Sequence, residues 1–82
     1  MRWEKEEYRK YGIFFEILTI CKNPARLDQI EKSINANCEL IENWLRELEV
    51  KGLINKKGVH WLTTPQGKSY IKLFEKIKNL ID

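Results

Sequence analysis

The sequence predicts a single α+β domain that is mostly helical, with four helices and one short β-hairpin. Apolar residues recur at helical spacing through four segments, turn residues separate these segments, and two short apolar runs flank a glycine turn at Gly58. The length of 82 residues predicts one domain, residues 1–82, and no linker or repeat divides it. Apolar residues make up 43% and charged residues 33%, which indicates a folded chain rather than a disordered one.

The first helix is expected from about Glu4 to Cys21. From Gly12 onward its apolar positions cover about 220° of the helical wheel, and only Gly12, Glu16 and Thr19 mark a solvent side. A helix that is apolar over so much of its circumference is buried on more than one side. We therefore expect this helix to lie at the centre of the domain or to meet a partner as well.

The second helix is expected to be short, from about Arg26 to Ser33. Pro24 prevents the first helix from continuing into it. Its apolar residues are spaced i, i+3 and i+7, which gives a single buried stripe. These residues are Leu27, Ile30 and Ile34.

The third helix is expected from about Cys38 to Lys51. Asn37 is a suitable N-cap, and Gly52 suits the left-handed residue that ends a helix. The buried face is predicted to contain Leu40, Ile41, Trp44, Leu45 and Leu48. The opposite face is centred on Glu39, Glu42, Asn43, Arg46 and Val50.

The hairpin and the last helix follow directly. The strands are expected at Leu53–Ile54 and Val59–Thr63, because Gly58 suits a turn with positive φ. Thr64 is a suitable N-cap with Pro65 at the first helical position. The apolar face of the last helix comprises Tyr70, Leu73, Phe74, Ile77, Leu80 and Ile81, and Lys68, Lys72 and Lys76 lie opposite. So clean a stripe predicts a helix–helix contact.

The order of these elements predicts a winged helix. A short helix, a three-residue connection and a longer helix form a helix-turn-helix over about residues 26–51. The hairpin over about residues 53–63 is the two-stranded wing, and a C-terminal helix follows over about residues 65–81. A further strand of one or two residues is expected between Pro24 and Arg26.

Three segments resemble the small winged-helix regulators of archaea and archaeal viruses and, more distantly, the PadR-like and MarR-like groups. The segments are Ala25–Ile30, Lys51–Ile54 and Trp61–Gly67, and the resemblance extends over about residues 12–81. It implies a homodimeric transcriptional regulator that binds double-stranded DNA. The third helix would enter the major groove, the wing would contact the backbone or the minor groove, and the first and last helices would form the dimer interface.

Acidic and basic residues are concentrated in different segments of the chain, and this distribution matters for DNA binding. The net charge is +3, and the sequence pI of about 8.9 is compatible with a nucleic-acid partner without requiring one. Residues 37–50 contain one basic and four acidic residues, whereas residues 51–82 contain seven lysines and two acidic residues. The third helix is therefore acidic, unlike a typical recognition helix, because phosphate contacts need Lys and Arg.

Candidate DNA-binding residues lie on the third helix, on the wing and at the start of the second helix. Asn43 suits adenine, Arg46 suits guanine, and Glu39 and Glu42 can accept a hydrogen bond from cytosine N4. The full set is Arg26, Asn37, Glu39, Glu42, Asn43, Arg46, Lys56, Lys57 and His60. The alternative is a winged helix that binds a basic protein through its acidic third helix and binds little DNA. Glu39 and Glu42 then serve only to favour the helix N-terminus.

The aromatic residues at the start of the first helix suggest where a second copy would bind. Trp3, Tyr8 and Tyr11 lie beyond the reach of a three-helix core, whereas Trp44 and Trp61 are expected in the core. The candidate interface comprises Trp3, Tyr8, Tyr11, Phe15, Tyr70, Phe74, Ile77 and Ile81.

The remaining chemistry of the sequence is sparse. Cys21 and Cys38 are expected to be buried thiols, and a disulfide or a redox role, favoured for Cys38 by its helix N-terminus, is the alternative. One His and two Cys without a C-x-x-C pair predict no metal site, and no motif indicates a cofactor or catalysis. The sequence also predicts no signal peptide and no membrane span, and hence a cytoplasmic protein.

Overall fold

The computed structural model describes the backbone of residues 6–81 and the side chains of residues 9–80. Its elements are α1 (Glu6–Ile20), β1 (Ala25–Arg26), α2 (Leu27–Ile34), α3 (Cys38–Val50), β2 (Ile54–Lys57), β3 (His60–Thr63) and α4 (Pro65–Ile81). The three strands form an antiparallel sheet in the order β1-β3-β2. This architecture is the predicted winged helix, including the two-residue first strand.

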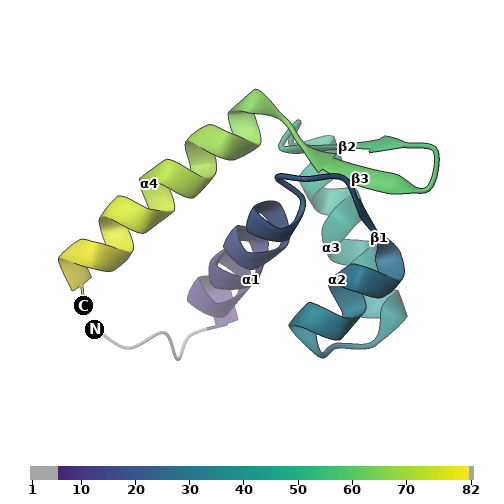
Figure 1. Cartoon of the computed structure of the whole chain (residues 1–82). Coiled ribbons are helices and arrows are strands. Elements are labelled where there is room, and N and C mark those ends of the chain that lie inside the picture. Colours follow the sequence, from purple (N-terminus) through teal and green to yellow (C-terminus); the bar gives the residue numbers. More distant parts are fainter. Residues whose placement is uncertain (1–5, 82) are drawn as a thin grey trace.

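Helix α1 lies between α4 on one side and α2 with α3 on the other, and the sheet closes one end of the helices (Figure 1). It contacts α2, α4 and β3, which supports the central position, one of the two alternatives expected from its wide apolar arc. The core is made by Phe14, Ile17, Leu18, Cys21, Ala25, Ile30, Ile41, Leu45, Leu48, Ile54 and Ile71.

Four expectations about individual elements are corrected by the structure. The first strand of the hairpin is Ile54–Lys57 rather than Leu53–Ile54, because the residues expected in the connection pair with β3. Arg26 belongs to β1, where it pairs with His60, so α2 begins one residue later than predicted. Leu40 is 40% exposed rather than buried, because the first turn of α3 reaches only the shallow groove beside Ile13 and Trp44. The two tryptophans, Trp44 and Trp61, pack against the core but are only partly buried.

Only part of the apolar stripe of α4 contacts α1. The Phe15 and Phe74 rings stack with centroids 4.8 Å apart, and the Tyr70 hydroxyl donates a 2.9 Å hydrogen bond to the carbonyl of Tyr11. The helix–helix contact predicted for this stripe therefore exists within the chain. The remaining stripe residues stay exposed, at 62% for Leu73 and 87% for Leu80.

The end of α1 is tied to the sheet by one threonine. The last carbonyls of a helix have no partners inside the helix. Here the hydroxyl of Thr63 donates a 2.6 Å hydrogen bond to the Leu18 carbonyl, and the Thr63 amide donates a 2.9 Å bond to the Cys21 carbonyl. Thr63 is 4% exposed, so these bonds are formed away from water. A single residue of β3 therefore caps the C-terminus of α1.

Thr64, the residue after Thr63, links the end of α3 to the start of α4. Gly52, with φ of 76°, ends α3 in a Schellman motif, in which Leu53 N–H bonds to Leu48 and Gly52 N–H bonds to Glu49. The hydroxyl of Thr64 donates a 2.7 Å bond to the Gly52 carbonyl and accepts a 3.0 Å bond from Gly67 N–H. The predicted N-cap of the last helix is thus confirmed, and it also holds the end of α3.

Gly67 allows α4 to begin directly against the backbone that follows α3. A Cβ atom at Gly67 would overlap the backbone carbonyl oxygen of Leu53 and would lie 2.5 Å from Thr63 Cγ2. The backbone of α4 can approach this closely only because residue 67 has no side chain.

We predict that Gly67→Ala lowers the free energy of unfolding by about 2–3 kcal/mol, because the added methyl forces α4 away from Leu53. Gly12→Ala in α1 is the matched control, since its Cβ would lie 3.9 Å from Phe74, an ordinary contact. That control should gain about 0.5–1 kcal/mol from helix propensity. Urea unfolding followed by circular dichroism measures both, and equal stability of Gly67→Ala and the unchanged protein would contradict the packing described here.

Candidate functional site

The outward face of α3 is the first component of the site. Asn37 caps this helix, its Oδ1 accepting a 2.8 Å hydrogen bond from Leu40 N–H. Asn43 and Arg46 lie one turn apart on the exposed side and project away from the core. The acidic side chains around them, Glu39, Glu42 and Glu49, are exposed as well. The polar face predicted for the third helix is therefore confirmed as a solvent-exposed surface.

One of the four glutamates of α3 is neutralised within the chain. Glu47 Oε2 lies 2.7 Å from Lys10 Nζ, and this ion pair joins α3 to α1. The same ammonium lies 5.6 Å from the centroid of the Phe14 ring. Glu47 thus serves helix packing, and its charge contributes less to the outward face than the sequence implies.

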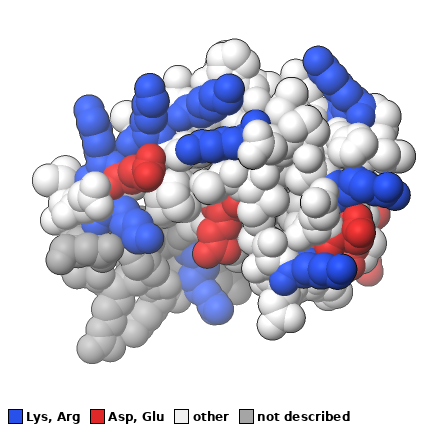
Figure 2. Space-filling view, viewed as in Figure 1, with Lys and Arg blue, Asp and Glu red and all other residues white. Residues whose placement is uncertain are grey.

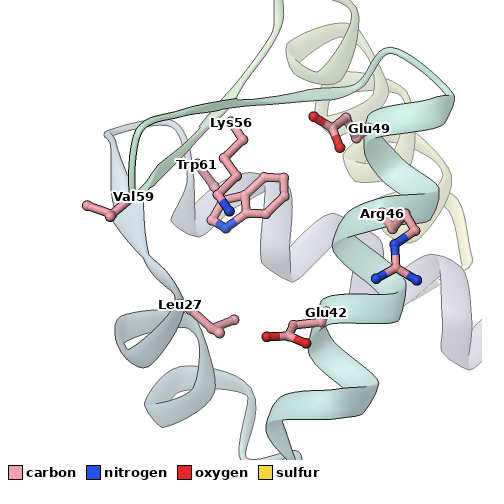
Figure 3. A pocket seen from close by; sticks show the side chains of 7 residues that line it. All are labelled: Leu27, Glu42, Arg46, Glu49, Lys56, Val59 and Trp61. Carbon is pink, nitrogen blue, oxygen red and sulfur yellow. The ribbon is translucent and has the colours of Figure 1, made fainter.

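A cleft of about 410 Å³ separates α3 from the wing (Figure 3). Seven residues line it: Leu27, Glu42, Arg46, Glu49, Lys56, Val59 and Trp61. The Trp61 ring projects between the wing and α3, while Val59 points away from the cleft at the hairpin turn (Figure 3). Sequence reasoning placed Trp61 in the core and did not identify Leu27 or Glu49 as site residues, because their proximity depends on how the wing packs against α3.

The two wing lysines lie on opposite faces of the sheet. Lys56 pairs with Trp61, and its Nζ lies 5.4 Å from the centroid of the Trp61 ring, a cation–π contact inside the cleft. Lys57 pairs with His60, which in turn pairs with Arg26. Because neighbouring residues of a strand alternate between faces, these three side chains share the face opposite the cleft.

The wider distribution of charge is visible on the surface. Lys and Arg side chains form a row along α4, and others lie around the wing and α2, where acidic side chains are interspersed (Figure 2). On α2, Asp28 Oδ1 lies 3.8 Å from Arg26 Nε, with both side chains mostly exposed. An exposed pair of this kind contributes little energy. Arg26 therefore remains able to bind another anion.

The residues predicted for a dimer interface fall into three groups. Phe15, Tyr70 and Phe74 are partly buried between α1 and α4. Tyr11 and Ile77 are 48% and 49% exposed. Trp3 lies outside the described residues, as do the side chains of Tyr8 and Ile81.

The described part of the chain offers little other chemistry. Within residues 9–80, no three His, Cys, Asp or Glu side chains form a group that could hold a metal ion. No helix among the described residues is long and apolar enough to cross a membrane.

Comparison with known proteins identifies one family. The model of a family described as winged helix-turn-helix matches residues 9–82, which is nearly the whole chain. A search of curated proteins finds no match.

The two cysteines carry free thiols, and they differ in environment. Cys21 is buried in the core as predicted, and this burial raises the pKa of its thiol to about 12. Cys38, by contrast, is exposed, and its Sγ donates a 3.5 Å hydrogen bond to Glu42. Desolvation, together with the carboxylates of Glu42 and Glu31, raises the pKa of Cys38 to about 11. These acidic neighbours favour the neutral thiol of Cys38, so the expectation that the helix N-terminus favours its thiolate is wrong.

We predict that Cys38 reacts slowly with iodoacetamide at pH 8, at least about tenfold slower than a cysteine in an unstructured peptide, because little of it is thiolate. Its rate should rise as the pH approaches 11. Glu42→Gln should raise the rate at pH 8 by lowering the pKa of the thiol, whereas Glu39→Gln should not. Peptide mass mapping of the alkylated site measures these rates, and a Cys38 that reacts like a free peptide thiol would contradict the raised pKa.

Proposed function

Because the chain belongs to the winged helix-turn-helix family, we propose that it binds double-stranded DNA as a homodimeric transcriptional regulator inside the cell. Helix α3 would enter the major groove and the wing would contact the phosphate backbone. The observation that carries this proposal is the position of Asn43 and Arg46 on the exposed face of α3, across a cleft from a basic wing. A duplex can meet both elements from one side of the molecule.

Asn43 and Arg46 supply the base contacts in this proposal. Asn43 can form a bidentate contact with adenine and Arg46 with guanine, and each such contact discriminates against the wrong base by about 1–3 kcal/mol. The wing supplies phosphate contacts through Lys56 and Lys57. Asn37 lies at the N-terminal end of α3, where its side chain already caps the helix.

The exposed glutamates of α3 shape the specificity we expect. Glu39, Glu42 and Glu49 repel phosphates, so α3 must approach the base edges rather than the backbone. Glu39 and Glu42 can each accept a hydrogen bond from the N4 amino group of cytosine. We therefore expect a DNA site with cytosine beside the guanine contacted by Arg46.

We predict how the unaltered chain and three variants bind DNA. Affinity for duplex DNA should fall steeply between about 50 and 200 mM salt, because phosphate contacts release counterions. Arg46→Ala should relax preference at one base pair, and Lys57→Glu should weaken binding to all sequences alike. Lys72→Glu on α4 is the control for the same change of charge away from the site. Selection of binding sequences followed by fluorescence anisotropy measures these effects.

The same experiment decides between this proposal and its alternative. The exposed acidic residues of α3 favour a second function, in which this helix binds a basic protein. Absence of duplex binding at about 50 mM salt would contradict the DNA-binding proposal. Recovery of a basic protein partner that is lost in Glu42→Lys but retained in Lys72→Glu would then support the alternative.

The homodimer part of the proposal is supported by apolar residues left exposed on α4. Leu73, Ile77 and Leu80 are spaced i, i+4 and i+7, and they are 62%, 49% and 87% exposed. Tyr11 of α1, 48% exposed, adds to the apolar residues outside the core. Such a stripe suits a self-complementary contact between two copies of the helix about a twofold axis.

We predict a solution mass of twice the 9.9 kDa chain mass. Leu73→Asp should give a folded monomer, because Leu73 is exposed within one chain and its loss leaves the core intact. Lys76→Asp is the control on the other face of α4 and should remain dimeric. Light scattering measures the mass and circular dichroism the folding. A monomeric unaltered chain would remove α4 as a dimer interface.

A further inference from the structure

We infer that the cleft between α3 and the wing binds an organic cation, an alkylammonium or guanidinium group carried on an aliphatic chain. The ring of Trp61 forms one wall of this site, and the carboxylates of Glu42 and Glu49 form the other. Two sources can supply such a group, a free polyamine and the arginine or lysine side chain of a basic peptide. The inference goes beyond the proposed DNA binding and does not depend on it.

The wing side of the cleft already attracts a cation. The Nζ atom of Lys56 lies 5.4 Å from the centroid of the Trp61 ring, within the range of about 6 Å over which an aromatic face attracts an ammonium group. The ring is only partly buried, and it projects into the gap that faces α3 (Figure 3). Leu27 adds an apolar side chain to the same cleft, which suits the methylene groups that carry the charge.

The α3 side of the cleft supplies negative charge. Glu42 and Glu49 both line the cleft, and their carboxylates point from α3 toward the gap (Figure 3). Glu42 Oε1 accepts a hydrogen bond from Cys38 Sγ, which leaves Oε2 available. Glu49 has no ion-pair partner among the side chains of residues 9–80. Because the two glutamates are two helical turns apart, about 10 Å along the axis, a linear diamine or triamine can bridge them.

Two cations of the chain also line the cleft, Arg46 and Lys56, and they balance the charge of the two glutamates. Both are long exposed side chains whose charged ends can move into water. The Trp61 ring, by contrast, is held by its packing against the core. A ligand cation therefore replaces Lys56 on the ring, and Lys56 is the internal competitor of the ligand.

The test follows the indole N–H signals of the ¹⁵N-labelled full chain by NMR at about 150 mM salt. The probes are spermidine and a blocked tripeptide with a central arginine. The Trp61 signal should shift with a Kd of about 0.1–10 mM, whereas the Trp44 signal should not, because its ring lines a different groove. The same tripeptide with a central glutamine controls for the peptide, magnesium chloride controls for charge alone, and neither should shift the Trp61 signal.

Two exposed lysines of the hairpin provide matched variants. Lys56→Met should tighten binding of the probes about two- to fivefold, because it removes the group that competes for the Trp61 ring. Lys57→Met removes the same charge from the opposite face of the sheet, so affinity should change by less than about twofold. Glu49→Gln should weaken binding about two- to fivefold through loss of its carboxylate. Thermal unfolding verifies that these variants remain folded.

The two probes distinguish the sources of the cation. Tighter binding of spermidine would identify a free polyamine as the ligand, and tighter binding of the arginine peptide would identify a basic side chain. An unchanged Trp61 signal at about 10 mM of both probes would overturn the inference, as would equal effects of Lys56→Met and Lys57→Met. None of these measurements involves DNA, so the DNA-binding proposal holds or fails separately.

Discussion

The hydrogen bonds of Thr63 and Thr64 are the interactions on which the rest of the structure depends. Thr63 caps the last carbonyls of α1, and Thr64 joins the end of α3 to the start of α4. Because buried hydrogen-bonding groups are costly to leave unpaired, this junction fixes three helix ends relative to the sheet. The close approach of Gly67 to the Leu53 carbonyl completes it. The wing extends from this junction, so its position beside α3 is determined there.

This junction places two elements of opposite charge, α3 and the wing, beside each other. The outward face of α3 is acidic apart from Arg46, whereas the wing and the strand beside it carry Arg26, Lys56 and Lys57. In the proposed complex, the helix reads base edges and the wing holds phosphates, which separates specificity from most of the affinity. The Lys10–Glu47 pair shows that not every charge of α3 faces outward. The placement of the charges is therefore a better guide to the kind of partner than the net charge of +3.

Local signals in the sequence predicted most of the fold, and contacts between distant residues determined what was missed. The caps at Asn37 and Thr64 and the left-handed turn at Gly52 depend on neighbouring residues, and all three were predicted correctly. The opposite faces of Lys56 and Lys57 depend on pairing between strands, where a shift of one residue reverses every side chain. The raised pKa of Cys38 likewise arises partly from Glu31, which lies on another helix. The sequence-predicted DNA-binding and dimer residues remain proposals.

The central claim is that α3 and the wing contact one duplex together. Titration of the ¹⁵N-labelled protein with duplex DNA, followed by NMR at residue resolution, tests it most directly. The account predicts that signals of Asn43, Arg46, Lys57 and His60 shift together, with those of the α4 lysines little changed. Shifts confined to α4, or shifts of α3 without those of the wing, would contradict it.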